Sequence, residues 1–267
     1  LGIVQGITEL LPVSSTAHMR IVPALLGWPD PGSAFSAAMQ LAALAAVVSY
    51  FWRDVSQLVS GSIGAVRQRD YSNQWFVLAV AIVLATIPIG IAGIALSSTL
   101  NACNSPLRGL MVIGISCVVM AVLLAAAELS CLHRRTVGEI RLRDALIVGI
   151  AQIGALIPGV SRSGSTLTAA LFLNFKREEA ARFSFLLGLP AIALAGLKEL
   201  WVLFHADLPA QAWAHLIFGL VIASISAFFA IWGLMRFLEK FSTWPFVIYR
   251  AVLGIFLIVA VSTGLLS

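Results

Sequence analysis

The sequence predicts an all-α protein that crosses a membrane several times, and three observations support this fold class. The chain has 267 residues, of which 60% are hydrophobic and only 11% are charged. Its mean hydropathy is +0.98. These values lie far from those of soluble domains. Apolar stretches of about 20 residues, the length of a membrane-spanning helix, recur along the chain. We therefore expect one integral membrane domain over residues 1–267.

Six of these apolar stretches are long enough to be full transmembrane spans. The parts left over, residues 1–27 and 143–174, are each long enough for two short helices with a break between them. We expect both parts to be re-entrant helix–loop–helix hairpins. The six expected spans are about 35–52, 75–97, 107–132, 183–204, 213–236 and 246–266.

The two leftover parts contain the same motif, because residues 2–16 and 149–163 align at an offset of 147 positions. Each copy is an apolar helical run that breaks at a proline and continues with hydroxyl side chains. Polar, broken segments are tolerated in a membrane only where they are buried in protein or line a cavity. Two copies predict a binding site between two halves. The matching residues are Gly2, Ile3, Gln5, Val13 and Ser14, and Gly149, Ile150, Gln152, Val160 and Ser161.

The distribution of basic residues predicts an orientation, because cytoplasmic loops are enriched in Lys and Arg. By this rule the spans 35–52 and 183–204 run in opposite directions. The halves, about 1–132 and 143–267, then form an inverted-topology repeat. The net charge of +5 reflects these loops, so we expect no nucleic-acid partner. The loops expected in the cytoplasm carry Arg53, Arg67, Arg69, Arg134, Arg135, Arg141, Arg143, Lys176, Arg177, Arg182, Arg236 and Lys240.

The first break carries chemically reactive groups. Gln5 and Glu9 are four residues apart and share one helical face. A carboxylate in the hydrocarbon layer needs a partner, a metal or water, and the alternative to a functional role is a Glu neutralised by a neighbouring Arg. Ser14, Ser15 and Thr16 follow Pro12, and N-capping explains one of these hydroxyls but hardly all three. His18 lies on the same face as Ser15, and it is either catalytic or a hydrogen-bonded core residue.

The second break has the composition of an oxyanion site. Gly159 lets the backbone approach a ligand closely, and Ser161, Ser163 and Thr166 supply hydroxyl donors. Arg162 adds a permanent positive charge with two-pronged geometry, and the following helix directs its free N–H groups to the same place. Phosphate is the most natural ligand of this set. The alternative is an Arg–Glu pair that ties the two halves together.

If the two hairpins meet, their residues form a phosphoryl-transfer site. Arg162 and the hydroxyls would hold a phosphate group. Glu9, with Gln5 as a weaker second ligand, would hold a divalent cation, and Ser15 and His18 would be nucleophile and base. This arrangement requires the Glu9 and Arg162 side chains to lie within about 10 Å of each other.

The motifs resemble the two signature motifs of the bacterial undecaprenyl-diphosphate phosphatases, the bacitracin-resistance family. The first motif is Gln5-x-x-x-Glu9 with residues 11–18, the second is residues 158–166, and residues 244–250 are also similar. The resemblance implies hydrolysis of undecaprenyl diphosphate, which recycles the lipid carrier of cell-wall synthesis. It also implies a multi-pass protein of the inner membrane, a divalent cation such as Mg or Ca, and access from the outer side. By motif position, the functional residues are Glu9, Ser15, His18, Arg162 and Thr166.

A lipid-phosphate flippase or transporter is the alternative from another class, because inverted repeats with broken helices are common in carriers. Apolar grooves between spans would contact membrane lipids and hold the prenyl chain of the substrate. The sequence leaves a homodimer open. The three cysteines, Cys103, Cys117 and Cys131, lack metal-ligand spacing. Leu1 is not a natural start, so we expect that further residues precede it.

Overall fold

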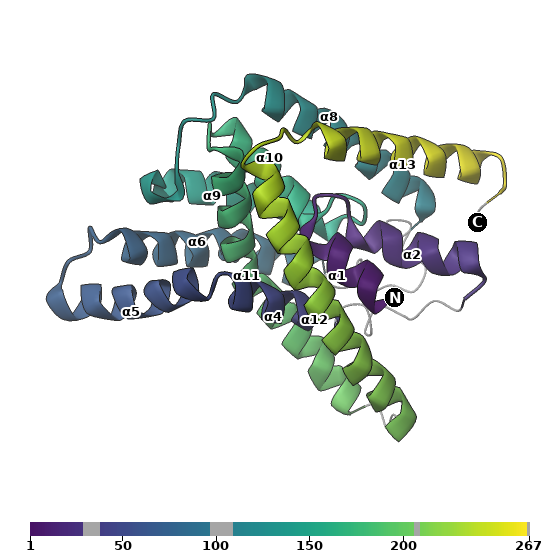
Figure 1. Cartoon of the computed structure of the whole chain (residues 1–267), viewed down its shortest axis with the longest axis horizontal. Coiled ribbons are helices and arrows are strands. Elements are labelled where there is room, and N and C mark those ends of the chain that lie inside the picture. The colour runs from purple at the N-terminus through teal and green to yellow at the C-terminus, as the bar shows by residue number, and fades with distance from the viewer. Residues whose placement is uncertain (29–37, 97–108, 206–208, 266–267) are drawn as a thin grey trace.

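The protein is all-α over the residues that its computed structural model describes, which are 1–28, 38–96, 109–205 and 209–265 (Figure 1). No β-strand occurs in this part of the chain, where the only extended pairing is a single bridge between Arg135 and Phe175. The helices are α1 (Gly2–Leu10), α2 (Ser15–Leu26), α4 (Gln40–Tyr50), α5 (Trp52–Gln68), α6 (Gln74–Ala95), α8 (Leu110–Ser130), α9 (Leu142–Ile153), α10 (Arg162–Phe172), α11 (Arg177–Phe204), α12 (Ala210–Leu238) and α13 (Trp244–Ser262).

Five of these helices, α6, α8, α11, α12 and α13, are long and apolar enough to cross a membrane. They agree with five of the six spans expected from the sequence, and α11 begins at Arg177, earlier than the expected residue 183. The protein is therefore a multi-pass membrane protein.

The expected first span, 35–52, differs from the structure. Its described part is α4, which has 11 residues and ends where the backbone of Phe51 leaves the helical region at φ −95° and ψ 29°. Eleven residues rise about 16 Å, roughly half of the hydrocarbon thickness. Residues 35–37 lie outside the described residues. The basic segment after this span, expected as a loop, is the helix α5. Figure 1 shows α5 and α6 as a pair at one end of the molecule.

Both expected hairpins are helix–break–helix units. α1 ends at Leu10 and α2 begins at Ser15, with Pro12 between them. α9 continues into a short 3-10 turn, Gly154–Leu156, and α10 begins after Pro158. Proline has no N–H for the helical ladder, which favours the end of each helix shortly before its proline. The inverted topology and the repeat boundaries remain predictions.

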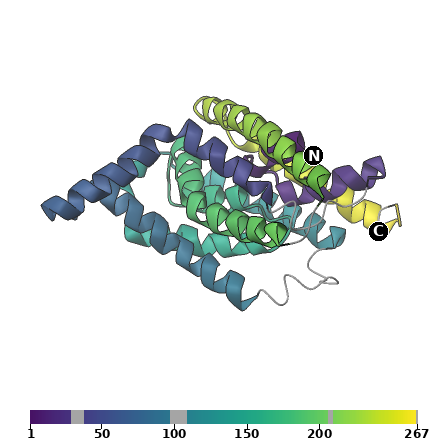
Figure 2. The same cartoon turned by 90° about the horizontal axis from the view of Figure 1, so that it is seen from below.

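Each helix–break–helix unit packs on a long helix from the other half of the chain. α1 packs on α12, and α9 packs on α6. The contacts are close: a Cβ on Gly6 would lie 2.4 Å from the carbonyl oxygen of Ala223, and a Cβ on Gly149 would lie 2.5 Å from that of Ala85. Small residues allow such approach between helices in membranes, where packing replaces the hydrophobic effect. Each unit is therefore held by a long helix from the other half (Figures 1 and 2).

The helices α8 and α13 form the largest contact between the halves and lie side by side in Figure 1. They cross where Gly114 faces Gly254, since a Cβ on either glycine would come within 3.0 Å of the other's carbonyl oxygen. At the ends of these helices, Glu128 accepts hydrogen bonds from Arg177 and Thr243 at 2.8 Å each. This pairing ties the end of α8 to the starts of α11 and α13.

Candidate active site

Glu9 is the centre of the site, and its side chain contacts three polar groups. The carboxylate is 7% exposed. Its Oε2 atom accepts hydrogen bonds from Gln5 Nε2 at 2.9 Å and from Ser15 Oγ at 2.6 Å. Its Oε1 atom lies 3.4 Å from Arg162 Nη2. A buried carboxylate is stable only with such partners, so the first break is built around this one negative charge.

Arg162 brings the second break to the first. The sequence analysis required Glu9 and Arg162 to lie within about 10 Å, and their side chains form an ion pair at 3.4 Å. This contact is longer than the usual 2.7–2.9 Å of charge-assisted bonds. Within the described part of the chain, no other side chain is hydrogen-bonded to the guanidinium. Most of its five donors therefore have no protein partner among these residues.

The position of Arg162 depends on a glycine in α11. A Cβ added to Gly188 would lie 1.7 Å from Arg162 Nη1 and 3.0 Å from Cζ. The guanidinium thus occupies the space that any side chain at position 188 would need. Gly188 has no signal in the sequence, because its role depends on a contact between α10 and α11 that no local pattern shows.

Both second helices begin at a serine N-cap with the same unusual backbone. Ser14 has φ 71° and ψ 94°, and its side chain accepts a hydrogen bond from the N–H of Ala17. Ser161 has φ 70° and ψ 124°, and its side chain accepts one from the N–H of Gly164. A positive φ is strained for a residue with a Cβ, and such strain is typical of functional turns. Ser14 is therefore a cap, as is Ser161, and each cap orients a helix N-terminus.

Ser163 joins the two breaks directly. Its hydroxyl donates to the carbonyl oxygen of Leu11 at 3.1 Å, with a longer contact of 3.5 Å to that of Glu9. It also lies 3.1 Å from Ser161 Oγ. Together with the Glu9–Arg162 pair, this contact places the two helix N-termini at one place. Positive dipole ends at such a place favour an anion.

His18 has a different partner from the one expected. Its Nδ1 lies 2.7 Å from the carbonyl oxygen of Ser14, which can only accept, so Nδ1 carries a proton. Its Nε2 is in hydrogen-bonding contact with the hydroxyl of Tyr249, and the two rings stack. In neutral His18, Nε2 is therefore the acceptor and Tyr249 the donor. The structure pairs Ser15 with Glu9 rather than with His18, while the catalytic role of each residue remains a prediction.

The other two expected hydroxyls lie in different surroundings. Thr166 is fully buried, and its hydroxyl donates to the carbonyl oxygen of Arg162 at 2.8 Å and contacts Ser184 Oγ in α11. Its hydroxyl thus connects α10 to α11 behind the site. Thr16 is exposed in the first turn of α2.

The residues present fit a hard divalent cation held jointly with a phosphate ligand. Among the described residues, no three or more His, Cys, Asp or Glu side chains lie close enough together to hold a metal ion by themselves. Glu9 supplies carboxylate oxygens, and Gln5 donates its Nε2–H to Glu9, while its side-chain oxygen accepts no hydrogen bond from the described residues. Mg²⁺ typically binds one or two protein carboxylates and completes its shell with phosphate oxygens and water. Glu9 and Gln5 suit this kind of site.

Two residues of α13, Tyr249 and Arg250, also belong to the site. Arg250 is 1% exposed and donates to carbonyl oxygens of both breaks. A sequence signal for Arg250 existed, because an arginine inside an apolar span is costly and usually functional. Tyr249 lies with Arg250 in the family-like stretch 244–250, but its residue type alone indicated no role, since tyrosines are common near membrane interfaces.

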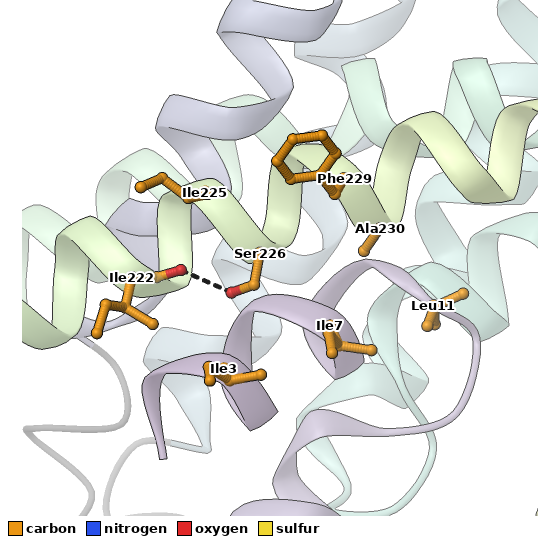
Figure 3. A pocket seen from close by; sticks show the side chains of 8 residues that line it. All are labelled: Ile3, Ile7, Leu11, Ile222, Ile225, Ser226, Phe229 and Ala230. Carbon is orange, nitrogen blue, oxygen red and sulfur yellow. Dashed lines mark hydrogen bonds between the residues drawn. The ribbon is translucent and has the colours of Figure 1, made fainter.

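An apolar groove of about 610 Å³ runs beside the first break, between α1 and α12 (Figure 3). Ile3, Ile7 and Leu11 form one wall. Leu11 also contacts the second break, because its carbonyl oxygen accepts the hydrogen bond from Ser163. The second wall consists of Ile222, Ile225, Ser226, Phe229 and Ala230 of α12.

Comparison with known proteins shows which family the chain resembles. The family model described as "Bacitracin resistance protein BacA" matches residues 1–256. The chain is 72% identical over 263 residues to "Undecaprenyl-diphosphatase 2" of Mesorhizobium japonicum, which covers 98% of this chain and 100% of the relative. It is 50% identical to "Undecaprenyl-diphosphatase" of Gloeobacter violaceus, over 100% of this chain and 91% of the relative. The protein of the same name from Synechococcus elongatus is 47% identical, over 100% of this chain and 93% of the relative.

Proposed function

Because the chain belongs to the bacitracin-resistance family BacA, we propose that it hydrolyses undecaprenyl diphosphate to undecaprenyl phosphate and inorganic phosphate. The names of its relatives as undecaprenyl-diphosphatases support this proposal. The observation that carries it is the 3.4 Å contact between Glu9 and Arg162, which places an acid and a guanidinium from two helix breaks at one site.

The diphosphate group binds between the breaks. Arg162 offers a planar fork of donors that matches phosphate oxygens. The N-termini of α2 and α10 add free N–H groups and positive dipole ends. A ligand phosphate competes with Glu9 for Arg162, and the long Glu9–Arg162 contact makes this exchange easier than a tight bidentate pair would.

Ser15 is the proposed nucleophile and Glu9 its base. Ser15 Oγ donates a 2.6 Å hydrogen bond to Glu9 Oε2, which is within the range needed for proton transfer. Attack of Oγ on the terminal phosphorus forms the Oγ–P bond and breaks the bond to the bridging oxygen. The hydroxyl proton passes to Glu9, and undecaprenyl phosphate leaves with the bridging oxygen. Water then cleaves the phosphoserine and releases inorganic phosphate.

A divalent cation, Mg or Ca, would be held by Glu9 and Gln5 together with phosphate oxygens. It would neutralise the negative charge of the diphosphate. The carboxylate has two oxygens with different neighbours, Oε2 toward Ser15 and Oε1 toward Arg162. His18 is held by Ser14 and Tyr249, so it lines the site beside the reacting serine instead of bonding to it.

The groove between α1 and α12 holds part of the prenyl chain. Its lining is almost entirely aliphatic or aromatic, and Leu11 links it to the second break (Figure 3). Burial of apolar surface stabilises the complex by roughly 25 cal/mol per Å². The lipid substrate and the several membrane helices suit a protein of the bacterial inner membrane with its site open to the outer side. The transporter alternative receives no support, since the relatives carry the names of diphosphatases.

The proposal is tested by phosphate release. Purified protein in detergent should release inorganic phosphate from undecaprenyl diphosphate in the presence of Mg²⁺. Arg162→Ala should abolish release and keep the helical circular-dichroism spectrum. The matched control is Arg236→Ala in α12, because Arg236 stacks on Trp232 and has no contact with the site. Wild-type protein that binds the lipid but releases no phosphate would contradict the proposal.

A further inference from the structure

Arg250 is a buried arginine that contacts both helix breaks. Its side chain extends from α13 and is 1% exposed. Nη1 donates to the carbonyl oxygen of Pro12 at 3.0 Å. Nη2 donates to those of Gly159 at 2.7 Å and Val160 at 3.0 Å. The two ends of one planar guanidinium therefore bind the two breaks separately.

The acceptors of Arg250 are carbonyls that the helix breaks leave without helical partners. Such buried carbonyls destabilise a fold unless another donor satisfies them. Both strained N-caps are close in sequence, since Ser14 follows Pro12 by two residues and Ser161 follows Val160 directly. The first turn of α10 also packs on the same group, because a Cβ at Gly164 would lie 2.9 Å from Arg250 Nη1.

Charge alone does not explain this arrangement. Within the described residues, Arg250 makes no ion pair with a carboxylate, and its three hydrogen bonds go to backbone oxygens. An unpaired buried charge is costly, and a lysine would carry the same charge. What arginine adds is a rigid fork with two donor ends at a fixed separation.

We propose that Arg250 is a positioning residue that fixes the distance between the two breaks, so that Ser15 and Glu9 from one break meet Arg162 from the other. This inference rests on the proposed phosphatase function. It assigns to α13 a part in the site that neither signature motif contains. Arg250 acts through Pro12, Gly159 and Val160, and it touches neither the nucleophile nor the Glu9–Arg162 pair.

The test compares Arg250→Lys with Arg250→Gln, and uses Arg236→Lys as the matched control. Lysine keeps the charge and loses the fork. Misplacement of reacting groups by about 1 Å costs on the order of 10²-fold in rate, so we expect kcat for phosphate release to fall about 10²-fold in both Arg250 variants. KM should change much less, because Arg162 still binds phosphate. Arg236→Lys should behave as wild type.

A second readout does not depend on activity. Hydrogen–deuterium exchange should become faster in peptides covering residues 11–18 and 158–165 of Arg250→Lys, and stay unchanged in the start of α13. An Arg250→Lys protein with wild-type kcat and wild-type exchange would overturn the proposal. Full activity in the lysine variant with loss only in Arg250→Gln would also overturn it, in favour of a purely electrostatic role.

If the Arg250 variants do not fold, Gly164→Ala replaces them. Its Cβ would displace Arg250 Nη1. Both kcat and the protection from exchange at the two breaks should therefore fall, by a smaller factor than expected for the Arg250 variants. Unchanged kcat and exchange in this variant would contradict the proposal. If wild-type protein releases no phosphate, the proposed function fails, and the exchange experiment alone then decides the role of Arg250.

Discussion

Ser14 and Ser161 adopt nearly the same strained backbone conformation at positions 147 residues apart. Their φ angles are 71° and 70°, and each side chain caps a helix by accepting a hydrogen bond from the N–H three residues later. Two separate parts of the chain thus build the same turn, and the structure brings the turns together through Ser163 and Leu11. The shared conformation makes the effect of substitutions at these caps predictable.

Ser161→Gly should raise the free energy of unfolding by on the order of 1 kcal/mol. Glycine removes strain of about 1–3 kcal/mol at a positive φ, and as an N-cap it is only a few tenths worse than serine. Ser161→Ala keeps the Cβ and loses the cap, so it should lower the same free energy by about 1 kcal/mol. Thermal unfolding of the two variants in the same detergent checks this order. A Ser161→Ala variant more stable than Ser161→Gly would show that the turn is not strained.

Gly188→Ala should reduce kcat/KM for phosphate release by about 10²-fold while the protein stays folded. The new Cβ must displace the Arg162 guanidinium, and a displacement of about 1 Å has an effect of this size. The end of a flexible side chain can move, so the fold tolerates the change. Gly233→Ala in α12 is the matched control, because a Cβ there meets no atom within 4 Å. Equal activities of the two variants would remove Gly188 from the site.

Glu9→Gln should lower kcat by about 10²–10⁴-fold, the usual contribution of a general base. The amide is similar in size and still accepts a hydrogen bond from Ser15, but buried Arg162 loses its ion-pair partner, so the free energy of unfolding should also fall. Steady-state phosphate release and circular dichroism measure the two effects. A Glu9→Gln enzyme with more than a tenth of the wild-type kcat would require another base for Ser15.

Gln5→Glu should lower the Mg²⁺ concentration needed for half-maximal activity by on the order of tenfold, because affinity for hard cations rises with the number of charged ligands. Gln5 already contacts Glu9 at 2.9 Å, so a carboxylate at position 5 would lie beside the cation site. Titration of activity with Mg²⁺ measures the shift. Gln57→Glu, at an exposed position of α5, is the control and should leave the titration midpoint unchanged. A shift in the control alone would contradict the assignment of Gln5.

His18 and Tyr249 should be energetically coupled, because they share a hydrogen bond and a ring contact. Tyr249→Phe should therefore have little further effect in a protein that already carries His18→Gln. A double-mutant cycle on kcat measures the coupling, and directly contacting pairs show 0.5–3 kcal/mol. Additive effects would show that the contact plays no part in the reaction. Nitrogen NMR should find the proton of neutral His18 on Nδ1.

The sequence alone was sufficient for the membrane class, the five long spans and the two breaks. Hydropathy depends only on local composition, and Pro12, Pro158 and the serine caps act within a few residues of themselves. The motifs also identified Glu9, Ser15 and Arg162, which the structure places in contact. The same local reasoning expected a full first span and missed α5, because length and hydropathy do not show where a helix bends.

Only the tertiary structure decided which groups meet. The pairing of Ser15 with Glu9, the contact of His18 with Tyr249 and the fork of Arg250 join residues from different helices. The packing of α1 on α2, and of both α10 and α13 on α8, brings these helices together. Such contacts depend on the shapes of helix surfaces, where a missing Cβ at Gly6 or Gly149 lets two helices approach and a missing Cβ at Gly188 leaves space for the Arg162 guanidinium. Local patterns contain no information on that fit.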